Sequence, residues 1–174
     1  MKKILLAGAV LLFAAPAMAQ SIGEKTGVNA VLGVAPKTED FVKQAAISDM
    51  FEIESSKLAQ QKADAESKAF ADKMVKDHTE TSTELKALVS GGKVKAEIPA
   101  AMDDAHKSKL EKLQKLNGDD FDDQYDSDQQ AAHKDAVSLF ERYAKGGENA
   151  DLKAFASKHL PHLQEHLKMA EGLK

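Results

Sequence analysis

The chain has 174 residues, no cysteine and a formal net charge of −4, with acidic and basic residues mixed along its segments. The absence of cysteine excludes disulfides, a thiolate metal site and a thiol nucleophile. Because positive charge is not concentrated anywhere, the sequence has no electrostatic footprint for nucleic acid or for an anionic membrane surface. Alanine, leucine and charged residues dominate and β-branched residues are sparse, so the composition favours helix throughout.

The N-terminal residues 1–19 have the pattern of a secretory signal peptide. Two lysines precede an apolar run over residues 4–15, and small residues occupy positions −3 and −1 before Gln20. This pattern predicts cleavage after Ala19 and a periplasmic or secreted protein. The apolar run is shorter than the roughly 20 residues that a membrane-spanning helix needs, and later stretches are shorter still, so we expect no transmembrane segment.

Residues 20–36 predict a flexible linker because they contain glycine and proline and have no sustained hydrophobic period. The remainder, residues 37–174, predicts one helical domain. Capping residues and paired glycines mark where its helices begin and end. The predicted long helices cover residues 38–61, 64–90, 119–146 and 149 onward, and Pro161 in the last of them removes one helical hydrogen bond and predicts a kink.

The connection between the second and third long helices is much longer than the other two. It runs over residues 93–118 and predicts a short helix over residues 100–116. Two tight hairpins joined by one long crossover are the connectivity of ferritin-like proteins. The sequence therefore predicts an all-α, ferritin-like antiparallel four-helix bundle with a long crossover that carries a short extra helix.

Each of the four long helices places a polar candidate ligand on or beside its apolar stripe. An isolated charge in a dry core is costly, so a carboxylate and several imidazoles there either pair with one another or hold a metal. Imidazole and carboxylate groups suit iron, zinc, copper or manganese. The candidate ligands are Glu54, His78, His133, His162 and His166, with Asp77 and Glu165 as partners that would orient them.

The ligand from the first helix has two candidates. Counted from the hairpin turns, Asp49 matches the height of His78, whereas Glu54 is about 9 Å away along the helix axis but shares the face of the apolar arc. We favour Glu54 on the ground of its face. A variant of the hypothesis adds the sulfur of Met74 or Met169 and would favour copper. In the structural alternative, hydrogen bonds such as Glu54 to His78 only fix the register of the bundle.

Several segments of the chain resemble one bacterial family of secreted proteins, known as domain of unknown function 4142 and often labelled predicted outer-membrane protein. The resemblance covers about residues 37–172 and implies a ferritin-like four-helix bundle in an extracytoplasmic setting, without a settled activity. The segments that carry it are Phe41 to Ala46, Phe70 to His78, Phe121 to Tyr125, Ala132 to Val137, Leu139 to Arg142, Leu160-Pro161, and Glu165 to Leu167. The motif positions that the resemblance implies are Glu54, Asp77, His78, Tyr125, His133, Pro161 and His166.

Similarity to true ferritins is weaker, because their di-iron site uses Glu-x-x-His pairs on two helices. Here the residues three before His78 and His166 are Val75 and Leu163, so we do not expect ferroxidase chemistry. The sequence offers no nucleophilic triad and no phosphate-binding loop, and it assigns no catalytic residue.

Two functional hypotheses follow from the sequence. In the first, the protein is an exported helical bundle that binds a metal ion in its core. In the second, it is a non-catalytic envelope-associated or stress-related interaction protein whose buried histidines are purely structural. The partners consistent with this second hypothesis are another copy of the chain or an envelope component.

Overall fold

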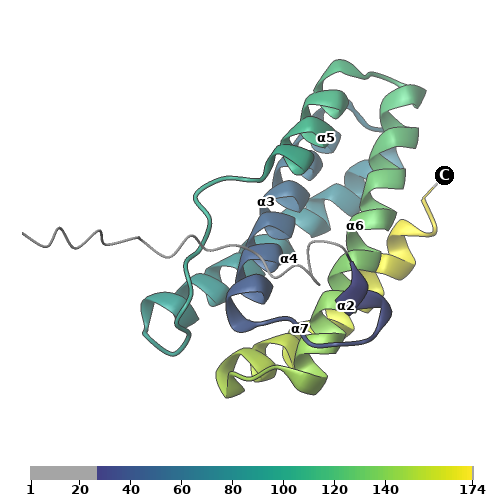
Figure 1. The fold of residues 1–174 in the computed structure, drawn as a ribbon. Coiled ribbons are helices and arrows are strands. Elements are labelled where there is room, and N and C mark those ends of the chain that lie inside the picture. The colour runs from purple at the N-terminus through teal and green to yellow at the C-terminus, as the bar shows by residue number, and fades with distance from the viewer. Residues whose placement is uncertain (1–26, 174) are drawn as a thin grey trace, which may run out of the picture.

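Six helices make up the regular structure of residues 27–173, which is the part of the chain that the computed structural model describes. The predicted signal peptide and residues 20–26 of the predicted linker lie outside this part. No strand occurs between residues 27 and 173, so the all-α fold class is confirmed. The helices are α2 (Val28–Val31), α3 (Thr38–Lys62), α4 (Ala65–Ser90), α5 (Asp104–Lys115), α6 (Asp119–Gly146) and α7 (Ala150–Ala170) (Figure 1).

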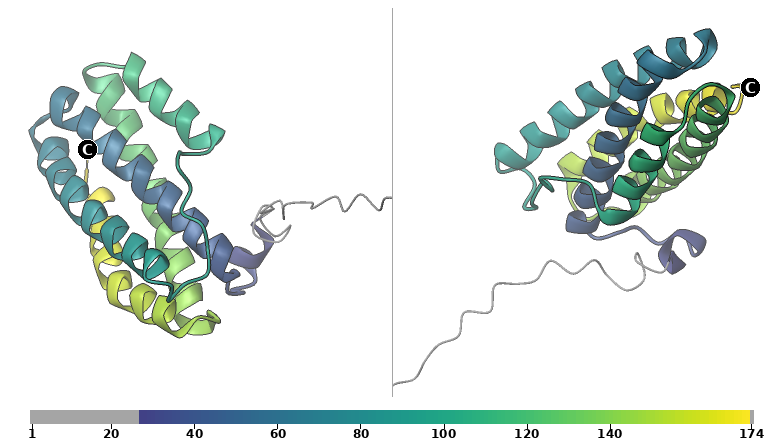
Figure 2. Two further views of the ribbon diagram at one scale, coloured as in Figure 1. Left: turned by 90° about the vertical axis from the view of Figure 1, so that its left-hand side faces the viewer. Right: turned by 90° about the horizontal axis from the view of Figure 1, so that it is seen from above.

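The long helices form two hairpins, α3 with α4 and α6 with α7, and the crossover between them carries α5 against α3 and α6 (Figures 1 and 2). The contacts of α3 with α6 and of α4 with α7 close the four long helices into one bundle. This is the predicted arrangement of two hairpins and a long crossover. Within the described range, no helix combines the length and the apolar character needed to cross a membrane.

Side-chain caps set several helix boundaries close to the predicted positions. The Asp64 carboxylate accepts the Ser67 amide at 2.8 Å, and Asn149 Oδ1 accepts the Leu152 amide at 2.9 Å. The crossover helix begins at residue 104, four residues later than predicted, because the Asp103 carboxylate caps it. Helix α7 continues through Pro161 to Ala170.

The part of the predicted linker that the structure describes is more ordered than the sequence indicated. It contains the helical turn α2, and the Arg142 guanidinium donates to the Val34 carbonyl at 2.7 Å. Directly after it, the Thr38 side chain and the Tyr143 hydroxyl are hydrogen-bonded at 2.8 Å. These contacts attach the start of α3 to the end of α6.

The core consists of two apolar clusters, one toward each end of the bundle. The first is centred on Phe41, Phe140, Tyr143, Leu152 and Phe155. The second is centred on Phe51, Phe70, Met74, Phe121 and Tyr125. Each long helix carries buried polar side chains at the level where the two clusters meet: Asp49 and Glu52 on α3, His78 on α4, Gln129 and His133 on α6, and His166 on α7. We call these six residues the polar layer.

The hairpin between α6 and α7 generates a stability prediction about two neighbouring glycines. A β-carbon at Gly147 would overlap the ring of Tyr143, which is held by Thr38 and packs 4.3 Å from Phe41 between ring centroids. We therefore expect Gly147→Ala to lower the free energy of unfolding in urea by about 1–3 kcal/mol.

Gly146→Ala is the matched control for that prediction. Its β-carbon would approach only the methyl group of Ala35, at 3.1 Å, and alanine gains about 0.5–1 kcal/mol over glycine inside a helix. A smaller effect than that of Gly147→Ala is expected. An equal or reversed order would contradict the packing described for Tyr143.

Candidate metal centre

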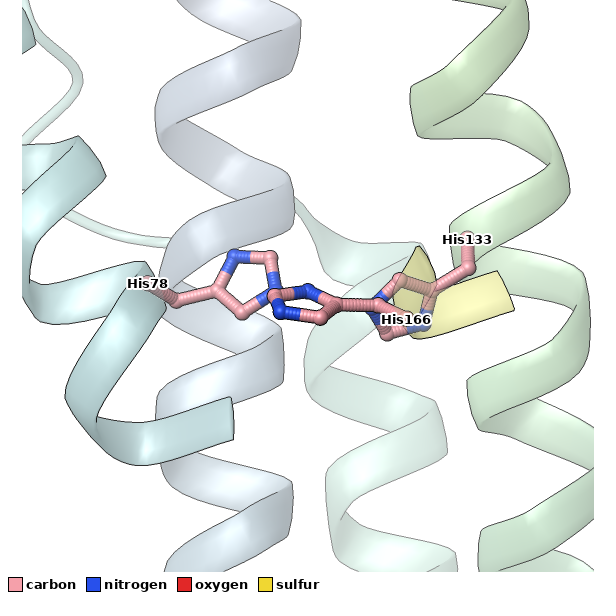
Figure 3. A group of neighbouring side chains, drawn as sticks. All are labelled: His78, His133 and His166. Carbon is pink, nitrogen blue, oxygen red and sulfur yellow. The ribbon is translucent and has the colours of Figure 1, made fainter. Parts of the chain in front are cut away.

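Three histidines from three different helices meet in the polar layer. His78 comes from α4, His133 from α6 and His166 from α7, and one ring nitrogen of each lies within 4.8 Å of the other two (Figure 3). Each pair of ring centroids is 5.5 Å apart. The three residues are 2%, 0% and 2% exposed, so the cluster lies inside the bundle.

Helical periodicity explains why these residues converge. His78 follows Met74 by four residues and therefore lies on the same buried face of α4. His133 lies between Tyr125 and Phe140 on the buried face of α6, and His166 lies between Leu163 and Ala170 on that of α7. Each histidine thus occupies the point at which its helix passes from one apolar cluster to the other.

One nitrogen of each ring is hydrogen-bonded to an acceptor. His78 Nδ1 lies 2.8 Å from Asp49 Oδ1, and His166 Nε2 lies 2.9 Å from Asp77 Oδ2. His133 Nδ1 lies 2.9 Å from the Gln129 carbonyl oxygen. Carboxylate and carbonyl oxygens only accept hydrogen bonds, so each of these ring nitrogens carries the proton. In a neutral imidazole the opposite nitrogen then carries the lone pair.

The opposite nitrogens are buried and have no hydrogen-bond partner in the part of the chain that the structure describes. They are His78 Nε2, His133 Nε2 and His166 Nδ1. Buried polar atoms without a partner are uncommon in folded proteins and call for an explanation. Three imidazole lone pairs gathered in one place, with the protons fixed on the far sides of the rings, form a donor set for a metal ion.

Electrostatics keeps two of the three rings in the neutral form that binds metals. Burial, together with the nearby charge of His78, lowers the pKa of His133 to about 3 and that of His166 to about 4. Burial also acts to lower the pKa of His78, but the hydrogen bond and charge of Asp49 outweigh it, and the pKa is raised above its ordinary value.

The carboxylates that orient the rings are themselves held in place. Asp49 Oδ2 accepts from the Ser82 hydroxyl at 3.1 Å, and Asp77 Oδ2 accepts from Lys73 Nζ at 2.8 Å. Burial acts to raise the pKa of Asp77, but hydrogen bonds from Lys73 and His166 outweigh it, and the pKa is lowered. Asp77 is therefore ionised at neutral pH and fixes the orientation of the His166 ring.

The size and access of the cluster suit a single ion. Bonds of 2.0–2.1 Å in a tetrahedral zinc site put neighbouring nitrogens about 3.3–3.4 Å apart. Nitrogens within 4.8 Å of one another would therefore approach by at most about 1.5 Å, which takes a shift of less than about an ångström by each ring. A pocket of about 180 Å³ between α4 and α7 leads from the surface to two of the three rings. Its lining includes Lys73, Asp77, His78, His162 and His166.

The structure brings together three of the five ligands predicted from the sequence, His78, His133 and His166. His162 is exposed and lines the pocket one turn before His166, outside the cluster. Asp77 contacts His166 as a supporting residue, whereas Glu165 is exposed. The two methionines of the sulfur variant, Met74 and Met169, pack in the second apolar cluster.

The placement of Glu54 predicted from the sequence is wrong. Its side chain is 47% exposed and its carboxylate lies 2.7 Å from Lys57 Nζ on the outer surface of α3. The buried face of α3 at this level is polar and carries Asp49 and Glu52. The apolar residues of α3 were a misleading guide to its inward face, because Phe51 packs against the crossover helix α5. There its ring lies 5.5 Å from that of His106.

Sequence reasoning missed Glu52 and Gln129, which are both fully buried beside His133. Glu52 Oε1 lies 3.9 Å from His133 Nδ1, and burial raises the pKa of Glu52 to about 7. A signal for Glu52 was present in the sequence. It lies three residues after Asp49, so a helix that turns Asp49 toward His78 turns Glu52 to the same side.

The described residues thus form a bundle made only of helices, with a cluster of three histidines in its core. The chain matches the family described as Domain of unknown function (DUF4142) over residues 23–173, and it belongs to that family. Comparison with curated proteins and with solved structures found no match.

The orientation of His166 by Asp77 generates a prediction about metal affinity. Replacing Asp77 with alanine frees the ring and removes the acceptor that keeps the proton on Nε2. We expect Asp77→Ala to weaken zinc binding, measured by competition with a chromophoric chelator, by roughly 10–100-fold. The control is Asp72→Ala, which replaces an exposed aspartate earlier on α4 and should bind zinc as the wild type does. Equal affinities in the two variants would contradict the orienting role.

Proposed function

We propose that the protein binds one transition-metal ion in the bundle core through His78, His133 and His166. The observation that carries the proposal is that three buried histidines each bring one ring nitrogen within 4.8 Å of the other two. In each ring one nitrogen has no hydrogen-bond partner among the described residues, while the opposite nitrogen donates to a fixed acceptor. The N-terminal sequence supports the further proposal that the protein acts outside the cytoplasm after removal of residues 1–19.

The arrangement of protons argues against the alternative of purely structural histidines. A structural cluster would satisfy its ring nitrogens by donating from one imidazole to the next. Here the hydrogen bonds with Asp49, Asp77 and the Gln129 carbonyl take the protons outward, so three acceptors face one another. A cation between them removes the mutual repulsion of the lone pairs.

The donor set also limits the metal. Neutral imidazoles suit zinc, copper, iron and manganese, and the ion that occupies such a site in the cell depends on metal availability as well as on affinity. Three nitrogen ligands leave at least one coordination position for a further group, which is the pattern of metal sites that exchange ligands.

Metal analysis of paired histidine variants tests the proposal. The wild type purified from the periplasm of its own cell is expected to carry close to one equivalent of metal. His166→Ala should lose the metal, because it removes one of three ligands. His162→Ala, one turn away on the same helix but exposed, should retain it. Metal-free wild type after reconstitution with zinc, iron, copper and manganese would contradict the proposal, and so would loss of metal in both variants to the same extent.

The proposal also predicts how affinity depends on pH. In the metal-free protein the pKa of His78 is raised, so its ring holds a proton below neutral pH that an incoming ion must displace. The pKa values of His133 and His166, at about 3 and about 4, leave these rings neutral. We therefore expect the apparent zinc affinity to fall by about tenfold per pH unit below pH 6.5, measured by isothermal titration calorimetry in two buffers. An affinity that stays constant from pH 7 to pH 5.5 would contradict the prediction.

A further inference from the structure

Glu52 lies inside the bundle beside His133, and no positively charged side chain among the described residues makes a hydrogen bond with it. The residue is 1% exposed, and neither carboxylate oxygen has a hydrogen-bond partner in the described part of the chain. The neighbouring Gln129 donates its amide nitrogen to Ser55 at 3.1 Å, and its own amide oxygen is also without a partner. Gln129 is close enough to act on the pKa of Glu52, but its amide is neutral and brings no positive charge. A carboxylate buried in this way is costly unless a cation accompanies it.

The position of Glu52 on α3 brings it to the side of the histidine cluster that has no imidazole. Helices α4, α6 and α7 each supply one ring, and α3 supplies Asp49 and Glu52, one turn apart on one face. Asp49 is bound to His78, and Glu52 Oε1 lies 3.9 Å from His133 Nδ1. An ion bound to Nε2 of an imidazole lies about 4.1 Å from Nδ1 of the same ring. Glu52 Oε1 contacts the opposite, outer edge of the His133 ring and is not part of the group of nitrogens that lie within 4.8 Å of one another. A rotation of the Glu52 side chain would therefore be needed to bring a carboxylate oxygen to the ion.

We infer that Glu52 is the fourth protein ligand of the ion, which makes the centre a site of three histidines and one carboxylate. This inference rests on the proposed function. Charge supports it, because the carboxylates of Asp49 and Glu52 together neutralise a divalent ion, while Asp77 is already paired with Lys73. A carboxylate oxygen among three nitrogens favours zinc, iron(II) or manganese(II) over copper(I), which prefers soft sulfur ligands.

Cobalt(II) is a suitable probe, because its visible absorption reports the identity and number of its ligands. The experiment titrates cobalt(II) into the metal-free full-length mature protein and compares Glu52→Gln with Glu54→Gln. Both substitutions replace a glutamate of α3 by its neutral isostere, but Glu54 lies on the outer surface. The wild type and Glu54→Gln are expected to bind one equivalent with the same spectrum. Glu52→Gln should bind at least about 100-fold more weakly, with shifted d–d bands. Glu52→Asp, which keeps a carboxylate, should recover part of the affinity.

Each result of this titration distinguishes the two proposals. If Glu52→Gln binds cobalt with the wild-type spectrum, even at lower affinity, Glu52 is not a ligand and only the present inference is overturned. Two equivalents in the wild type and one in Glu52→Gln would also overturn it, since Glu52 would then serve a separate ion. No binding by the wild type would overturn the proposed function and this inference together.

The stability of the metal-free proteins gives a second, independent readout. A ligand without its metal is an unpartnered buried charge, so removing that charge should not harm the fold. Metal-free Glu52→Gln is therefore expected to have a melting temperature equal to or above that of the metal-free wild type at pH 8. A lower melting temperature would overturn the inference, because the carboxylate would then make a stabilising contact in the absence of metal.

Discussion

The removal of a polar layer from water in the middle of an apolar bundle is the constraint on which the rest of the structure depends. Burying imidazoles and carboxylates costs free energy, which the packing of the surrounding helices must offset. The two apolar clusters lie on either side of the polar layer and hold all four long helices at that level. The clusters therefore fix the positions from which His78, His133 and His166 meet (Figure 3).

Hydrogen bonding then converts this placement into a chemical property. The same three rings without Asp49, Asp77 and the Gln129 carbonyl would be free to turn and to donate to one another. With these acceptors in place, each proton is held on the outer nitrogen, and the inner nitrogens are left as electron-pair donors. Helix α3 contributes no imidazole, but Asp49 orients the His78 ring and Glu52 places a second buried carboxyl group beside His133.

The sequence predicted the fold better than the site, for physical reasons. Capping residues, paired glycines and hydrophobic period are local signals, so the hairpins and the crossover followed from them directly. The histidines of α4, α6 and α7 could be found because they interrupt clear apolar stripes. Helix α3 has no such stripe at the level of the centre, since its inward face is polar and Phe51 packs on α5. The position along the bundle axis favoured Asp49, which does contact His78. The helical face favoured Glu54, and that choice was wrong because Glu54 lies on the outer surface.

The measurement that tests the central claim most directly is X-ray absorption at the zinc edge of the zinc-loaded protein. The account predicts one zinc per chain, with a first shell of nitrogen and oxygen at about 2.0–2.1 Å and the outer-shell scattering of three imidazole rings. Scattering from fewer than three imidazoles, or a shell of water oxygens alone, would contradict a metal centre built from His78, His133 and His166.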